Sequence, residues 1–155
     1  MPSPLPWTRG IRNIEERAAK LPPQTADEAL FRITGYVRIK SIIGIVTTAI
    51  GAVANATKLK HNPSGVGSDV DLCATLDITG DAVGQVYSIV GVLATALKST
   101  TLWLVVSADG MPANGVILGP GDLELDCAGS SGTGAIKWIV EWEPVSGDGN
   151  LVTVN

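Results

Sequence analysis

The sequence predicts an all-β fold: an antiparallel β-sandwich or jelly-roll-like domain with an extended, partly helical N-terminal arm. Three observations support this prediction. Valine, isoleucine, threonine and glycine dominate after residue 36, eight or nine short segments alternate apolar and polar side chains, and turn signals separate them. Short, evenly spaced strands are typical of sandwiches and barrels. We expect residues 1–33 to form the arm and residues 34–155 the antiparallel domain.

Two short helices are expected in the arm. Five prolines between residues 2 and 23 hold its flanks extended. Between them, Arg12–Lys20 is expected to form two helical turns, because Ile11, Ile14 and Ala18 fall on one stripe, although this stripe is too small to fold alone. Thr25 and Glu28 have the spacing of a capping box, which predicts a second helix over Ala26–Phe31.

The first strands are expected from Gly35 onward, where the apolar pattern takes a period of two. Val37, Ile39, Ile43 and Ile45 are expected on one face, with Arg38 and Lys40 on the other. A second strand is expected over Val46–Ala54. A helix over Ser41–Ala56 is the alternative, and β-branched residues disfavour it.

The clearest strand lies near the end of the chain. Over Ala135–Pro144, the side chains of Ile136, Trp138, Val140 and Trp142 are expected to face one way. Further strands are expected over Val70–Ile78, Gln85–Val92, Thr100–Ser107, Val116–Leu118, Leu123–Cys127 and Leu151–Val154.

Cysteine usage and hydropathy set limits on the environment. Cys73 and Cys127 are far apart, and no secretory signal is visible, so buried reduced thiols are expected and a disulfide is the alternative. The chain has no CxxC motif and no Cys/His cluster, so no zinc site is expected. The longest uncharged stretch, Ser41–Thr57, has 17 residues and is too polar and too short for a membrane span.

No catalytic pattern emerges, and the chain is not expected to be an enzyme or to bind a cofactor. The single histidine, His61, lies at a turn and is expected on the surface, and no serine has a partner base. The glycine-rich stretches lack the pattern of a phosphate loop. Nucleic-acid binding is disfavoured because the domain is acidic. The sequon at Asn55 is interpreted as coincidence.

Acidic residues recur at alternate positions in two places. Asp69 and Asp71 form one pair, and Asp122, Glu124 and Asp126 form a row on one face of a strand. Like charges in such a row repel each other unless cations lie close by. A solvated face, basic residues of another copy, or a hard cation such as Ca²⁺ are the possible interpretations. No metal site is assigned.

Charge is distributed unevenly along the chain. The residues up to 60 carry nine Lys and Arg against four acids (9 − 4 = +5), and the remainder carries two against eleven (2 − 11 = −9). Such a division favours head-to-tail contacts between copies, or contact with an oppositely charged partner. It indicates assembly rather than catalysis.

The region from Gly44 to Pro144 resembles a class of tailed-bacteriophage structural proteins. The residues that carry the resemblance are Ala54–Leu59, Asp71–Ile78, Asp81–Gly84, Tyr87–Gly91, Leu125–Ala128 and Thr133–Trp138. The resemblance implies a virion component: a small β-rich head-decoration protein, or a tail or fibre-base component, present in many copies as a symmetric oligomer. It has no active-site residues to transfer, and it does not extend to the first forty residues.

We therefore expect a capsid decoration (cement) protein, located in the virion, that forms a homo-oligomer, most simply a trimer, and stabilises the head through its arm. Its partners would be itself and the major capsid protein or another virion protein, without nucleic acid or membrane. The expected partner-binding residues are Trp7, Arg9, Ile11, Arg12, Ile14 and Arg17. The alternatives are a tail, baseplate or fibre-attachment subunit, and a cation- or carbohydrate-binding β-sandwich module.

Overall fold

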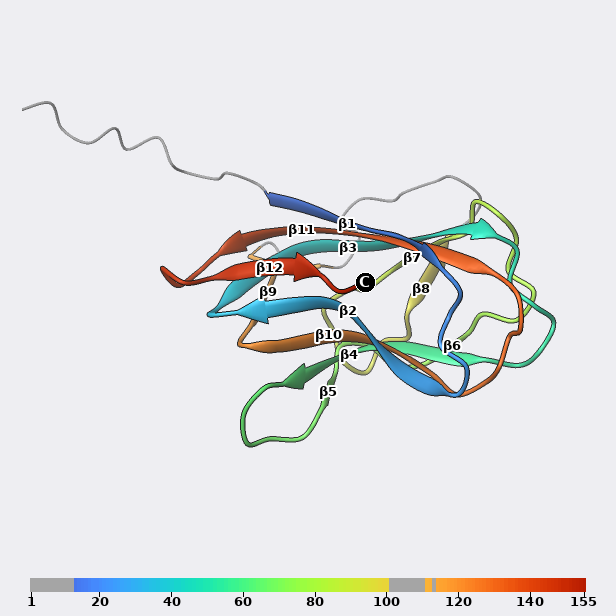
Figure 1. The fold of residues 1–155 in the computed structure, drawn as a ribbon, viewed down its shortest axis with the longest axis horizontal. Coiled ribbons are helices and arrows are strands. Elements are labelled where there is room, and N and C mark those ends of the chain that lie inside the picture. Colours follow the sequence, from blue (N-terminus) through green and yellow to red (C-terminus); the bar gives the residue numbers. More distant parts are fainter. Residues whose placement is uncertain (1–12, 101–110, 113) are drawn as a thin grey trace, which may run out of the picture.

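The computed structural model describes residues 13–100, 111–112 and 114–155, and within them the chain is all-β without helices (Figure 1). The all-β prediction is confirmed. The strands are β1 Asn13–Lys20, β2 Ala26–Thr34, β3 Val37–Thr48, β4 Ala56–Pro63, β5 Val70–Asp71, β6 Leu76–Asp77, β7 Val86–Ser88, β8 Lys98–Thr100, β9 Val116–Leu118, β10 Gly121–Cys127, β11 Ala135–Pro144 and β12 Asn150–Thr153.

The strands form two antiparallel sheets. Sheet A has the order β1-β11-β3-β7-β8, with β9 also paired to β3. Sheet B has the order β12-β2-β10-β4-β5, with β6 also paired to β4. In Figure 1 the strands β1, β11 and β3 run along the upper layer, and β2, β10 and β4 along the lower layer. The chain crosses between the sheets repeatedly, so partners in each sheet come from distant parts of the sequence.

The hydrophobic core combines side chains from both sheets. Trp138 and Ile42 come from sheet A, and Phe31, Leu59 and Leu123 come from sheet B, and all are at most 2% exposed. Burying a side chain of this size contributes about 1.5–3 kcal/mol. These side chains therefore hold the sheets together.

Strand β11 confirms the sequence pattern, whereas β3 departs from it. The four alternate apolar residues of β11 are all buried. In β3 the predicted alternation holds as far as Ile39. A register irregularity then places Ser41 opposite Glu141 and Ile39 opposite Trp142, so that one extra residue of β3 lies between the two pairs. Such a bulge reverses the facing of the residues that follow it. The prediction for Ile43 and Ile45 is therefore wrong: they face outward, and Ile42 is buried.

The prediction of two helices in the arm is wrong. The described part of Arg12–Lys20 is strand β1, which pairs with β11, and Ala26–Phe31 lies in β2, between β12 and β10. The capping box is absent, because Thr25 has a φ of 54° and Glu28 instead accepts a hydrogen bond from Arg17. Isolated two-turn helices are marginal, and pairing with long strands satisfies the backbone of these segments.

Several other expected strands change in extent. Val46–Ala54 is not a strand of its own, and the helix considered over Ser41–Ala56 is wrong because β3 continues to Thr48. Val70–Ile78 contains only the short strands β5 and β6, and Gln85–Val92 only β7. The strand expected over Thr100–Ser107 lies outside the described residues except for Thr100, which ends β8.

Candidate functional site

The six expected partner-binding residues fall into two groups. Four of them lie in residues 1–12, outside the described residues. Ile14 lies on β1 and is 67% exposed. Arg17 is only 4% exposed, and its guanidinium donates to the Val154 carbonyl at 2.9 Å and to Glu28 at 2.5 Å. Arg17 therefore links sheet A to sheet B and to the end of the chain.

The outer side of sheet B is a charged face, which we define by nine side chains. Strand β10 pairs with both β2 and β4, with a register shift on the β2 side between Leu123 and Glu124. Asp122 lies opposite Arg32 of β2, and Glu124 and Asp126 lie opposite Lys60 and Lys58 of β4. The nine members are Asp27, Arg32, Lys58, Lys60, Asp69, Asp71, Asp122, Glu124 and Asp126. The acidic row expected on one strand face is thus present, and cations of the same chain lie beside it.

Lys60 lies at the centre of the charged face. Its ammonium nitrogen is 2.5 Å from Asp27, 2.6 Å from Asp69 and 3.5 Å from Glu124, and its side chain is 7% exposed. Burial alone lowers the pKa of Lys60, but the hydrogen bonds to Asp27 and Asp69 outweigh it and raise its pKa. The ammonium group is therefore firmly charged at neutral pH.

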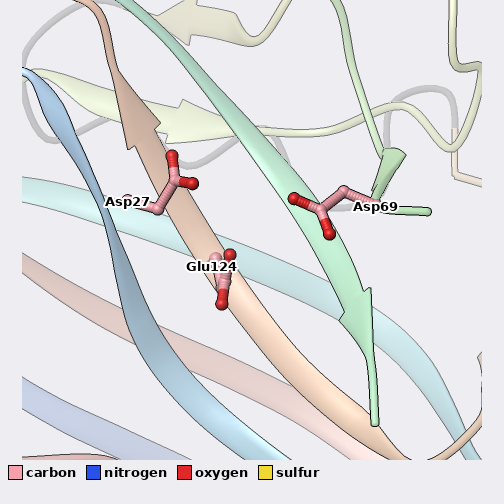
Figure 2. A group of neighbouring side chains, drawn as sticks. All are labelled: Asp27, Asp69 and Glu124. Atoms are coloured by element: carbon pink, nitrogen blue, oxygen red, sulfur yellow. The ribbon is translucent and has the colours of Figure 1, made fainter. Parts of the chain in front are cut away.

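The carboxylates around Lys60 form the group that most resembles a metal site among the described residues. One oxygen from each of Asp27, Asp69 and Glu124 lies within 4.8 Å of the others. Figure 2 shows that the three side chains come from β2, from the segment before β5 and from β10. Oxygen clusters of this kind suit hard cations. In this structure the Lys60 ammonium provides the positive charge that the three carboxylates share.

The remaining members of the charged face are also paired. Arg32 binds Asp122 through two parallel hydrogen bonds of 2.9 and 3.0 Å. Lys58 lies 2.9 Å from Asp71 and 3.7 Å from Asp126, and the hydrogen bond to Asp71 raises the pKa of Lys58. Three cations against six carboxylates leave the face with a charge of 3 − 6 = −3. Part of the uneven charge of the sequence is therefore neutralised within one chain.

The outer side of sheet A is different, and we call it the isoleucine face. It carries Ile14, Ile43, Ile45, Ile117 and Ile139, of which Ile43 lies directly opposite Ile139. Ile14 and Ile117 are 67% and 51% exposed, and the other three are half-buried. Charged side chains border them: Lys137 pairs with Glu16, and Arg38 and Lys40 pair with Glu143.

The single histidine and both cysteines are buried. His61 is 8% exposed, and its Nε2 lies 3.1 Å from the Gly119 carbonyl, so the expectation of a surface histidine is wrong. Cys73 and Cys127 are free and buried, as expected. Burial raises the pKa of both thiols, that of Cys127 to about 11.

Asn55 has a structural role that the sequence did not reveal. Its side chain is fully buried; its oxygen accepts from the Gly129 amide at 3.1 Å and its nitrogen donates to Ser131 at 2.9 Å. Asn55 thereby joins the segment before β4 to the turn after β10. A glycan on this nitrogen would require the site to open, which agrees with the interpretation of the sequon as coincidence.

Two general observations complete the description. Nowhere in the described part of the chain is there a helix of the length and hydropathy that a membrane crossing requires. Comparisons with protein-family models, with curated proteins and with solved structures find no match to this chain.

Proposed function

We propose that this chain is a bacteriophage structural protein, a capsid decoration protein that acts as a homo-oligomer, most simply a trimer, in the virion. We further assign its two sheets to a jelly-roll-like sandwich, an architecture common among capsid proteins. The sequence resemblance motivates the proposal. The observation that carries it is the isoleucine face, an apolar surface whose most exposed members are Ile14 and Ile117.

The position of this face supports a role for the N-terminal segment in assembly. Ile14 is exposed on the edge strand β1, one residue after the described part begins. Exposed apolar patches bordered by charged residues mark sites of protein–protein contact. The preceding residues include Trp7 and Ile11, which provide further apolar anchors. Ordering such a segment costs about 1–2 kcal/mol per residue, so these anchors need a partner that buries them.

The structure defines where a truncation has to stop. Deleting residues 2–12 leaves β1 intact, whereas removing residues 1–24 also removes β1 and with it an edge of sheet A. We expect the shorter deletion to keep the unfolding midpoint of the full chain and to lose binding to capsids assembled without the protein. Cosedimentation with those capsids measures the loss. Unchanged binding of the truncated chain would contradict a role for this segment.

Oligomerisation and location need separate measurements. Sedimentation equilibrium should give three times the 16.0 kDa chain mass, about 48 kDa, for a trimer. Quantitative mass spectrometry of purified virions should give hundreds of copies per particle for a decoration protein. A few copies per particle would favour the tail, baseplate or fibre-attachment alternative, and absence from virions would overturn the proposal.

The cation-binding alternative has its own test. Because the Lys60 ammonium lies among the three carboxylates, we expect millimolar calcium to leave the Tm of the protein unchanged. A Tm that rises with calcium concentration and returns on chelation would favour a cation-binding module.

A further inference from the structure

A surface hollow lies at the end of sheet B where β2 and β4 end and β10 begins. Its volume is about 370 Å³, and its lining includes Ile33, Pro63, Pro120 and the ion pair of Arg32 with Asp122. Pockets for small ligands start at about 300 Å³. The hollow therefore has room for one bulky side chain but not for a folded element.

The chemistry of the lining suits an aromatic ring. Pro63 and Pro120 provide the accessible apolar walls. Arg32 is 58% exposed, and its two hydrogen bonds to Asp122 fix the plane of its guanidinium. A planar guanidinium held in this way can stack on an aromatic ring, through a cation–π contact that is strongest for tryptophan.

The N-terminal segment carries a ring and charges that fit this place. Trp7 is the aromatic residue among residues 1–12, and Arg9 and Arg12 are the charged side chains of that segment. The hollow adjoins the charged face, whose charge is −3. The segment thus combines an apolar anchor with cations that match the neighbouring surface, and electrostatic matching of this kind steers association and fixes orientation.

We propose that Trp7 of one copy occupies the hollow of a second copy, with Arg9 and Arg12 along the charged face of that copy. The inference rests on the proposed function in that both require an oligomer.

The path available within one chain favours a second copy as the acceptor. Trp7 lies six residues before Asn13, which spans at most about 20 Å when extended. β1 and the hollow belong to different sheets, and the edge strand β12 lies beside β2, which borders the hollow. A path to the chain's own hollow has to bridge about 10 Å between sheets and also pass β12. Passing β12 and β2 to reach β10 adds two strand spacings of about 4.8 Å each, so the path within one chain uses about the full 20 Å, whereas a neighbouring copy is free to approach.

Photo-crosslinking tests the contact in the full chain. The variant Trp7→p-benzoylphenylalanine is prepared in an ordinary and a ¹⁵N-labelled form, and the two forms are mixed. The mixture is irradiated and digested, and mass spectrometry identifies the crosslinked peptides. We expect crosslinks to peptides that contain Pro63 or Pro120, half of them between chains of different isotope. Crosslinks within single chains only, or to other surfaces, would overturn the proposal.

Matched variants test the energetics. Trp7→Ala and Arg32→Ala should each weaken self-association measured by sedimentation velocity, Trp7→Ala by on the order of tenfold or more. Lys20→Ala removes the same charge from a similarly exposed ion pair, that with Glu28, which belongs to neither face, and should leave self-association unchanged. Equal weakening by Arg32→Ala and Lys20→Ala would indicate a nonspecific charge effect and contradict the proposal. If the oligomer persists in virions while crosslinks lie elsewhere, only this inference fails; a chain absent from virions and monomeric would defeat the proposed function as well.

Discussion

The outer sides of the two sheets have opposite character. The charged face of sheet B places nine ionised side chains side by side and satisfies its cations with carboxylates of the same chain. The isoleucine face of sheet A presents five isoleucines, two of them more than half exposed. Both sheets share one core, so burial of that core does not explain the difference.

Under the proposed function, we interpret the isoleucine face as the side that meets a partner and the charged face as the more strongly solvated side. Antiparallel sheets commonly bury one face and solvate the other, and sheet B follows that rule. In sheet A, the isoleucines remain apolar on the outer side, and charged residues border them without covering Ile14 and Ile117. Substitution of Lys60, at the buried centre of the charged face, should therefore act mainly on folding, and substitution of the exposed isoleucines mainly on association.

The largest change in the free energy of unfolding is expected for substitution of Lys60. Lys60→Ala leaves Asp27, Asp69 and Glu124 without their shared cation, and breaking a buried pair costs about 3–5 kcal/mol. Because Asp27 and Asp69 are nearly half exposed, we expect about 2–3 kcal/mol, measured by urea unfolding. Lys137→Ala, which removes an exposed cation from sheet A, should cost less than about 1 kcal/mol. Equal losses in both variants would remove the distinction between the faces.

The next largest loss of stability is expected at Arg17, which links the two sheets. Arg17→Ala removes hydrogen bonds to the Val154 carbonyl and to Glu28 at a site that is 4% exposed. Charge-assisted hydrogen bonds contribute about 1.5–3 kcal/mol, so we expect a loss of about 2 kcal/mol. Arg17→Lys should recover part of it. Unfolding monitored by circular dichroism gives the comparison, and no change in Arg17→Ala would show that the junction carries little stability.

A smaller effect on folding, with a larger one on association, is expected on the isoleucine face. Ile14→Ser should change the free energy of unfolding by about 0.5 kcal/mol or less, since the side chain is largely exposed. The same substitution should weaken the oligomer in sedimentation velocity. Val53→Ser, on an exposed valine in the loop between β3 and β4 and outside both faces, is the matched control and should leave the oligomer unchanged.

The smallest effect is a dependence on pH. The hydrogen bond from Arg38 and the charge of Lys40 lower the pKa of Glu143, so its contribution to stability is present above about pH 4.3 and is lost as the pH falls through the lowered value. Glu143→Gln should therefore be less stable than the parent at pH 7 and equal to it at low pH.

Asp81 provides the opposite control. Burial raises the pKa of Asp81 despite its hydrogen bond from Tyr87, so its contribution is present at low pH and is lost as the pH rises. The difference between Asp81→Asn and the parent should then change with pH in the opposite sense. Urea unfolding at pH 3 and pH 7 measures both differences, and parallel trends would show that one of the two assignments is wrong.

The sequence predicted those parts of the fold that depend on local alternation. The inward set of β11 is correct, because an uninterrupted period of two leaves a single choice of face. In β3 the same reasoning failed after Ile39, because the bulge that reverses Ile43 and Ile45 arises from pairing with β11. The segment Asn13–Lys20 fits a short helical stripe as well as a strand, and pairing with distant β11 decides between them.

The candidate surfaces were predictable to a similar degree. Alternate spacing placed Asp122, Glu124 and Asp126 on one face. Their partners were not predictable, since Arg32 and Lys60 reach them only through the pairing of β10 with β2 and β4. The burial of His61 follows from the same pairing, which places it opposite Leu123. The pairing of distant strands, rather than composition, determines which cations lie beside the acidic row and why His61 is buried.

The link between Arg17 and Val154 has a consequence for synthesis of the protein. These residues are 137 positions apart, and β1 must wait for β11 before it has a partner. During translation the first strand therefore leaves the ribosome long before sheet A can form. Sheet A can then close only after β11 has been made, and a nascent chain that stops before β11 exposes strand edges that are prone to aggregate.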